Sequence, residues 1–101
     1  MIFEPLPVAG AFLVSLEEIS DNRGFFARMF CGNIWKEHGL TPEVSQVNVS
    51  LTKNAGTIRG LHFQTSPHEE AKLIRCIHGS IFDVAAHDDC TDKCDSASGR
   101  A

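Results

Sequence analysis

The segment TIRGLHFQTSPHEEAKLIRC, residues 57–76, holds the side chains best suited to chemistry in this sequence. The unperturbed pKa of a histidine lies near neutrality, so His62 can exchange a proton at physiological pH. Arg59 and Lys72 are cations that could hold an anion formed beside that histidine. Abstraction of a proton from a carbon next to a carbonyl needs such a pair. His62 would be the base, and Lys72 or Arg59 would hold the enolate.

Two other interpretations of His62 remain open. A histidine on a strand is most often a hydrogen-bonded structural residue. It can also bind a metal, as in the small-barrel cupins, which use an H-x-H pair and a later carboxylate. Gln64 stands where the second histidine of that pair is expected, and an amide is a poor ligand for a transition metal. The sequence therefore predicts no metal site.

The geometry of a strand sets a condition on a shared site. Successive side chains of a strand point to opposite faces, so Arg59 and His62 point apart in a regular strand. Both can serve one site only if the strand breaks register between them, and Gly60 is the residue that permits a bulge. An unbroken strand over Thr57–Gln64 would count against a shared site.

Two further segments offer polar groups. In QVNVSLT the alternation places Gln46, Asn48 and Ser50 on one face and predicts that Val47, Val49 and Leu51 pack into a layer. The polar face is either solvated or a hydrogen-bonding surface for a ligand. In DNRGFF, Arg23 is either a solvated turn cation followed by two core rings, or a phosphate contact beside a stacking surface.

The elements that must position these residues are mostly short strands. Turn residues in DNRG separate two strand-like stretches, and a short helix is expected over Asn33–His38, ended by Gly39. We expect a tight turn at His78 and Gly79. This pattern predicts an all-β protein, a sandwich or a barrel. Six or seven strands are expected, fewer than a complete jelly roll needs, so the domain either borrows strands or is a fragment. The strand-like stretches are residues 11–20, 25–30, 42–53, 56–64, 71–77 and 80–86.

Composition narrows the class of protein. The chain has 101 residues and a net charge of −4, with no basic cluster that would suggest a nucleic-acid partner. No apolar run approaches about 18 residues, and the N-terminus is a poor signal peptide, so we expect a cytoplasmic protein without a membrane span. Cys31 and Cys76 have apolar neighbours and are expected to be buried thiols. Cys90 and Cys94 lie in a polar tail that is expected to be disordered, with a metal site there as the alternative.

Three stretches, in this order, carry a family resemblance: DNRGFFARMF, SQVNVSLTKNAGTIRGLHFQ and PHEEAKLIRCIHGSIFDVAA. Together they resemble the dTDP-4-dehydrorhamnose 3,5-epimerase family over about residues 10–86. The most specific part is RGLHFQ followed by KLIRC and by G-x-I-F-D-V.

The resemblance implies a fold and an activity. The fold is a cupin-like jelly roll (a double-stranded β-helix), here incomplete and with one short helix. Residues 1–87 would be its N-terminal part, and residues 88–101 a non-homologous, disordered tail. The activity is epimerisation of dTDP-4-dehydro-6-deoxy-glucose at C3 and C5, without metal or cofactor, in a homodimer. His62 and Lys72 take the catalytic positions, Asp83 is structural support, and the substrate-binding positions are Arg23, Phe26, Gln46, Asn48 and Arg59.

Two departures from the family pattern bear on activity. Arg28 stands where the family commonly has a glutamate, which could alter the choice of sugar. The family's tyrosine acid lies further along the chain, and this sequence has no tyrosine. We therefore expect a truncated member that cannot perform the family's full acid–base cycle alone, and a chain that is dimeric, aggregated or partly unfolded. The alternatives are a non-catalytic cupin-like binder of nucleotide sugars and a small metal-dependent cupin.

Overall fold

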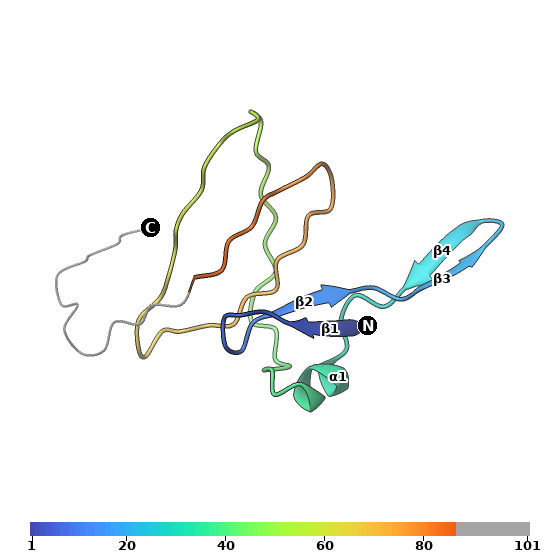
Figure 1. Cartoon of the computed structure of the whole chain (residues 1–101), viewed down its shortest axis with the longest axis horizontal. Helices are drawn as coiled ribbons and strands as arrows, with labels where there is room; N and C mark the ends of the chain where they lie inside the picture. The colour runs from blue at the N-terminus through green and yellow to red at the C-terminus, as the bar shows by residue number, and fades with distance from the viewer. Residues whose placement is uncertain (87–101) are drawn as a thin grey trace. The chain divides into compact units, whose positions relative to one another are not determined.

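Two short β-hairpins and one helix make up the regular structure in the computed structural model, which describes residues 1–86 (Figure 1). The strands pair as two separate two-stranded antiparallel sheets, β1 with β2 and β3 with β4. An all-β protein with one short helix is confirmed in this part of the chain. The elements are β1 (Ile2–Pro5), β2 (Phe12–Ser15), β3 (Glu18–Asp21), β4 (Gly24–Ala27) and α1 (Gly32–Glu37).

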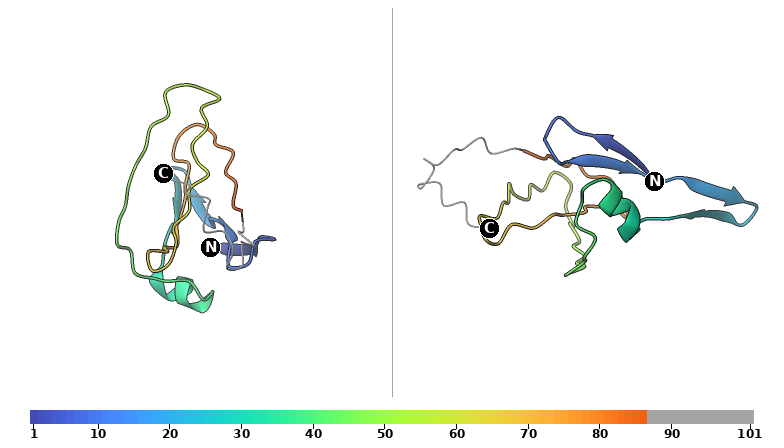
Figure 2. Two further views of the ribbon diagram at one scale, coloured as in Figure 1. Left: turned by 90° about the vertical axis from the view of Figure 1, so that its left-hand side faces the viewer. Right: turned by 90° about the horizontal axis from the view of Figure 1, so that it is seen from below.

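The first hairpin pairs β1, at the N-terminus, with β2, which lies in the stretch predicted as strand over residues 11–20. Ile2 pairs with Ser15 and Pro5 with Phe12. The connection is closed by the N–H of Leu6, which donates to the carbonyl of Ala11 at 2.9 Å. Both hairpins show in Figures 1 and 2, where β3 and β4 project away from β1 and β2.

The second hairpin confirms the turn predicted in DNRG and the strand-like stretches predicted before and after it. Ile19 pairs with Phe26, and Asp21 pairs with Gly24, which leaves a two-residue turn between them. Gly24 has a φ of +138°, a conformation that side-chain-bearing residues rarely adopt, so glycine is required where β4 begins. The aromatic stretch that follows the turn therefore forms a strand, as its composition predicts.

Helix α1 was predicted to within one residue at each end. It begins at Gly32 and ends at Glu37, with His38 as the C-cap and Gly39 at a φ of +72°. None of the helices in residues 1–86 is long and apolar enough to cross a membrane.

Helix α1 packs against the first hairpin through aromatic rings. Trp35 is the one residue of the described chain classed as buried and apolar, with 7% of its surface exposed. The ring of Phe3, on β1, lies edge-on to Trp35 at 5.2 Å and stacks on His38 at 3.8 Å between centroids. Phe12 and Phe30 complete this aromatic cluster, at 5.9 Å from Phe3 and 4.9 Å from Trp35 respectively.

The chain divides into two compact units: Met1–Pro42 with residues 74–86, and residues 43–73. In the second unit the chain runs out and reverses around residues 54–56, where Gly56 has a φ of +76° (Figure 1).

The prediction of strands over residues 42–53, 56–64, 71–77 and 80–86 is wrong for this structure, which has no strand there. A strand exists only where backbone groups find a ladder partner. Within residues 43–86 of the described chain, the one backbone hydrogen bond runs from His68 to the carbonyl of Thr65. His78 and Gly79 form a bend between extended segments, not the turn of a hairpin.

Two burial predictions are also wrong. The apolar face of QVNVSLT is open, with Val47 88%, Val49 82% and Leu51 78% exposed. Within residues 1–86 no second layer covers these side chains. Cys76 is exposed, whereas Cys31 is half-buried. The predictions for Cys90, Cys94 and the tail lie outside the described residues.

Candidate functional site

The predicted site residues fall in two units of the structure. Arg23 and Phe26 belong to Met1–Pro42, on the second hairpin. The remainder belong to the unit of residues 43–73. All of them are exposed, and they are Arg23, Phe26, Gln46, Asn48, Arg59, His62 and Lys72. Each unit therefore presents its own group of candidate residues.

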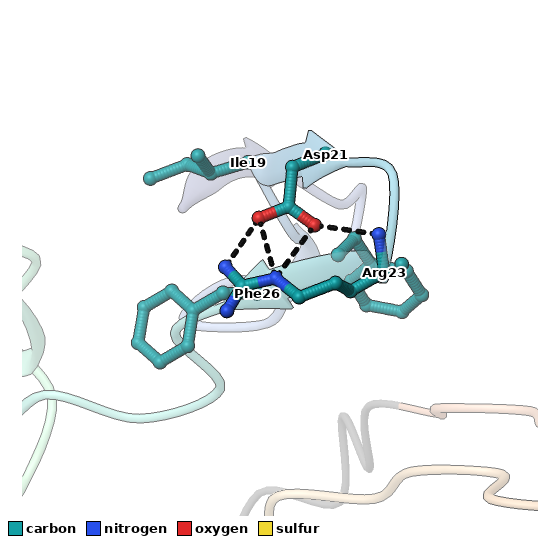
Figure 3. A pocket seen from close by; sticks show the side chains of 6 residues that line it. Ile19, Asp21, Arg23 and Phe26 are labelled. Carbon is teal, nitrogen blue, oxygen red and sulfur yellow. Dashed lines mark hydrogen bonds and ion pairs between the residues drawn. The ribbon is translucent and has the colours of Figure 1, made fainter.

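On the second hairpin, the Arg23 guanidinium is held by the carboxylate of Asp21 (Figure 3). Arg23 Nε donates to both carboxylate oxygens, at 3.2 and 3.1 Å, and Nη2 donates to Oδ2 at 2.5 Å. The backbone N–H of Arg23 also donates to Oδ1, at 2.8 Å. The side-chain and backbone donors of Arg23 hold the pKa of Asp21 below its usual value, and Asp21 raises the pKa of Arg23. Both groups are therefore charged at neutral pH.

A hollow of about 370 Å³ opens beside this ion pair. It is lined by Ile19, Asp21, Arg23, Gly24, Phe25 and Phe26. Phe25 and Phe26 are 60% and 66% exposed, so the interpretation of them as core rings is wrong. They lie on a hairpin that no second layer of the described chain covers. Asp21 was predicted only as a turn residue. The signal for its second role is a carboxylate two positions before an arginine.

In the unit of residues 43–73, Arg59 forms hydrogen bonds across a loop, to the segment that precedes the loop. Its Nε donates to Thr52 Oγ1 at 3.0 Å, and its Nη2 donates to the carbonyl of Leu51 at 3.1 Å. The hydroxyl of Thr57 donates to the carbonyl of Asn54 at 2.8 Å within the same loop. Arg59 thus has a structural task here that its sequence position did not predict.

Residues 56–64 form no strand, so the bulge predicted at Gly60 has no ladder to interrupt, but the backbone does take an unusual conformation at that glycine. Gly60 has a φ of +100°. A Cβ added there would lie 3.3 Å from the backbone nitrogen of His62 and 3.4 Å from its ring atom Nδ1. The imidazole therefore lies over Gly60, and this position favours glycine for both conformation and space. The structure brings His62 and Gly60 together, and it records no hydrogen bond between His62 and Arg59 within residues 1–86.

Lys72 is the second cation of this unit. Its ammonium lies 3.7 Å from Glu70 Oε1, and about half of its side chain is exposed. A long, exposed pair of this kind contributes little stability, so the ammonium can exchange Glu70 for another anion. Gln46 and Asn48 lie on the open limb before the loop, with their amides in solvent.

The chemistry available from these residues is proton transfer and anion binding. The unit of residues 43–73 offers an exposed imidazole and a weakly paired ammonium. The second hairpin offers a guanidinium beside an aromatic ring. Within residues 1–86, no group of three His, Cys, Asp or Glu side chains is placed to hold a metal ion.

Comparison with known proteins gives a consistent result. A family model described as dTDP-4-dehydrorhamnose 3,5-epimerase matches residues 5–92. A protein of that name from Sinorhizobium fredii is 38% identical over 85 residues, which are 84% of this chain and 44% of the relative. One from Methanothermobacter thermautotrophicus is 42% identical over 76 residues, 75% of this chain and 40% of the relative. A Streptomyces niveus protein named dTDP-4-dehydrorhamnose 3-epimerase is 32% identical over 83% of this chain and 41% of its own length.

No solved structure matches the chain. The chain spans less than half the length of these curated relatives. The family match nevertheless covers most of the chain and includes all the predicted site residues. The chain therefore belongs to the dTDP-4-dehydrorhamnose 3,5-epimerase family.

Proposed function

We propose that this chain supplies the base-containing part of a nucleotide-sugar epimerase that acts on dTDP-4-dehydro-6-deoxy-glucose at C3 and C5. The observation that carries the proposal is the family match over residues 5–92, which contains His62, Lys72 and the predicted binding positions. The curated relatives are named for this epimerisation.

His62 acts as the base and Lys72 as the electrostatic partner. His62 takes the proton from the carbon next to the C4 ketone. The electron pair of that C–H bond becomes the C=C bond of an enolate, and the negative charge moves to the C4 oxygen. The Lys72 ammonium leaves Glu70 and stabilises this oxygen. Return of a proton to the opposite face inverts the carbon, and the acid that returns it is not a tyrosine of this chain, which has none.

The geometry of residues 43–73 supports these roles. His62 is exposed, so a substrate can reach its ring. Its position over Gly60 leaves one face of the imidazole next to a residue without a side chain. Arg59, which already donates to Thr52 and Leu51, holds the loop and keeps further N–H donors for the substrate.

Deuterium exchange tests the proposal. The 101-residue chain is incubated with the 4-keto nucleotide sugar in deuterated water, and incorporation at C3 and at C5 is followed separately by NMR. The two carbons are separated because one relative is named for 3-epimerisation alone. We expect His62→Ala to lower the exchange rate by about 10²- to 10⁴-fold, the usual contribution of a general base. His78→Ala removes an exposed histidine outside the proposed site and should leave the exchange rate unchanged.

Binding measurements separate the outcomes of this test. Exchange that depends on His62 supports the epimerase. Binding of the nucleotide sugar without exchange would make the chain a non-catalytic binder, and neither binding nor exchange would overturn the proposal.

The finer architecture belongs to the same proposal. We infer that residues 1–87 form the N-terminal part of a cupin-like jelly roll, which works as a cytoplasmic homodimer without a cofactor. The support is family membership together with the hairpins of residues 1–42. Sedimentation of the chain with and without the nucleotide sugar tests the dimer, and a strictly monomeric species in both conditions would contradict it.

A further inference from the structure

The ion pair of Asp21 and Arg23 lies beside a hollow of about 370 Å³. Asp21 and Arg23 meet at the tip of the second hairpin through three side-chain contacts and one backbone contact. The Arg23 side chain is 86% exposed, so the pair is open to solvent (Figure 3). An exposed pair contributes little to stability, so its geometry calls for an explanation other than folding.

The contacts to Asp21 use only one edge of the guanidinium. An arginine has five N–H donors in a planar fork. Asp21 accepts from Nε and from one N–H of Nη2. The second N–H of Nη2 and one N–H of Nη1 point along the terminal edge, and Asp21 uses neither of them. That edge can bind two oxygens of a phosphate at once.

The hollow places an apolar surface next to this edge. Ile19 and Phe26 are directly paired across the two strands, so their side chains lie on the same face. Both line the hollow with Arg23, and Figure 3 shows them on the same side of the ion pair. A ligand with a planar ring and an oxyanion would use both features.

We propose that Asp21 is a positioning residue, which fixes the Arg23 guanidinium so that its free terminal edge is presented to the phosphate oxygens of a nucleoside diphosphate. The identity of this ligand rests on the proposed function. An aspartate carboxylate is ionised at neutral pH, and the donors of Arg23 lower the pKa of Asp21 further. The opposite role is also physically possible: Asp21 could compete with the ligand and weaken it by neutralising Arg23. The two roles predict opposite effects of removing the charge.

Binding of thymidine diphosphate to the 101-residue chain distinguishes the two roles. Asp21→Asn keeps one side-chain oxygen that can accept from the backbone N–H of Arg23. It loses the negative charge and the second oxygen that accepts from the guanidinium. We expect it to weaken binding by about three- to tenfold, because the ligand must then order the arginine side chain itself. Arg23→Ala should weaken binding further. Glu18→Gln removes a carboxylate of the same hairpin, opposite Ala27, and should bind as the unchanged chain does.

The order of the Arg23 side chain can also be measured without a ligand. In the unchanged chain the Nε–H of Arg23 should exchange slowly with water, as followed by ¹⁵N NMR, and Asp21→Asn should accelerate this exchange while Glu18→Gln does not. An equally fast exchange in the unchanged chain and Asp21→Asn would overturn the inference. So would thymidine diphosphate affinity that is equal or tighter in Asp21→Asn.

A titration with pyrophosphate distinguishes failure of the positioning role from failure of the proposed nucleotide site. If thymidine diphosphate does not bind, the proposed nucleotide site fails, and the same variants are titrated with pyrophosphate. Affinity for pyrophosphate that falls in both Arg23→Ala and Asp21→Asn supports the positioning role. Pyrophosphate affinity that is absent, or unaffected by Asp21→Asn, overturns it.

Discussion

Cys31 illustrates how a single residue is tuned by the start of a short helix. It is the N-cap residue of α1 and is half-buried. The backbone N–H of Ile34 is the main cause that lowers the pKa of its thiol, and Asn33 and Arg28 act in the same direction. Burial and Glu37 oppose them, but the net direction is downward. The thiolate is therefore favoured in the folded chain, where it lies near amide donors.

Alkylation of Cys31 should show this shift. The rate of reaction with iodoacetamide, followed by peptide mapping over a range of pH, should reach half its plateau at a lower pH in the folded chain than in concentrated urea. Each profile is normalised to its own plateau, which removes the effect of partial burial. By linkage, the stability from the thiolate is present above the unfolded pKa and is lost as pH falls through the folded pKa. Identical folded and unfolded profiles would contradict the assignment.

The backbone conformation of Gly60 affects the position of His62, the proposed base. An alanine there would need a φ of +100° and would place a methyl group about as close to His62 as contacts allow. We expect Gly60→Ala to lower the deuterium-exchange rate with little change in nucleotide affinity, because the imidazole is displaced while Arg23 is untouched. Gly10→Ala, whose Cβ would meet nothing within 4 Å although its φ is also positive, is the control for backbone strain. Equal effects of the two substitutions on exchange would refute the role.

At the scale of elements, α1 is closed by a complete Schellman motif. The N–H of Leu40 donates to the carbonyl of Trp35 at 3.0 Å, and the N–H of Gly39 donates to that of Lys36 at 3.0 Å. Gly39 supplies the left-handed conformation that this motif requires. We expect Gly39→Ala to destabilise α1 by about 1 kcal/mol and Gly39→Asn by less, because asparagine tolerates this conformation better. Urea unfolding followed by circular dichroism measures both, and equal stability of the three chains would show that the cap is dispensable.

The aromatic cluster packs α1 against the first hairpin. Phe3 contacts Phe12, Trp35 and His38, so it joins strand to helix. We expect Phe3→Ala to lower the free energy of unfolding by about 2 kcal/mol, less than for a fully buried ring. The chain has a single tryptophan, so the emission of Trp35 should also shift to longer wavelength. Phe82→Ala is the matched control because Phe82 is 94% exposed, and a similar loss in both variants would contradict the assignment.

The sequence predicts elements that depend on contacts between residues close together in the chain, and it fails where an element depends on a distant partner. The turn in DNRG and the helix ended by Gly39 rest on contacts within a few residues, and both were predicted correctly. Strands beyond Pro42 depend on partners far along the chain, which alternation alone cannot supply. The ion pair of Asp21 and Arg23 was missed because turn propensity already explained Asp21. Gly60 was singled out for its backbone freedom, and its φ is positive, but neither its closeness to His62 nor the hydrogen bonds of Arg59 were predicted.

At the scale of the whole molecule, the described chain exposes an unusual amount of apolar surface. Val47, Val49 and Ile58 are each more than 80% exposed, and the backbone around them has unpaired N–H and C=O groups. Large exposed apolar patches and unpaired strand edges promote association. The chain carries a net charge of −4, which opposes association only weakly once salt screens it.

We therefore expect the isolated chain to associate, and a charge on the apolar limb to reduce this. Val49→Lys should lower the sedimentation-average mass and the binding of a hydrophobic dye at equal protein concentration, because a lysine on this face must be desolvated when two chains meet. Ser50→Lys adds the same charge at the neighbouring position on the other face of the limb, so it controls for net charge. If the two lysine variants dissociate equally, general electrostatic repulsion explains the effect and the apolar face does not. A monomeric chain with a sharp, cooperative unfolding transition would contradict the expectation altogether, since it would mean that residues 43–86 find partners within the chain itself.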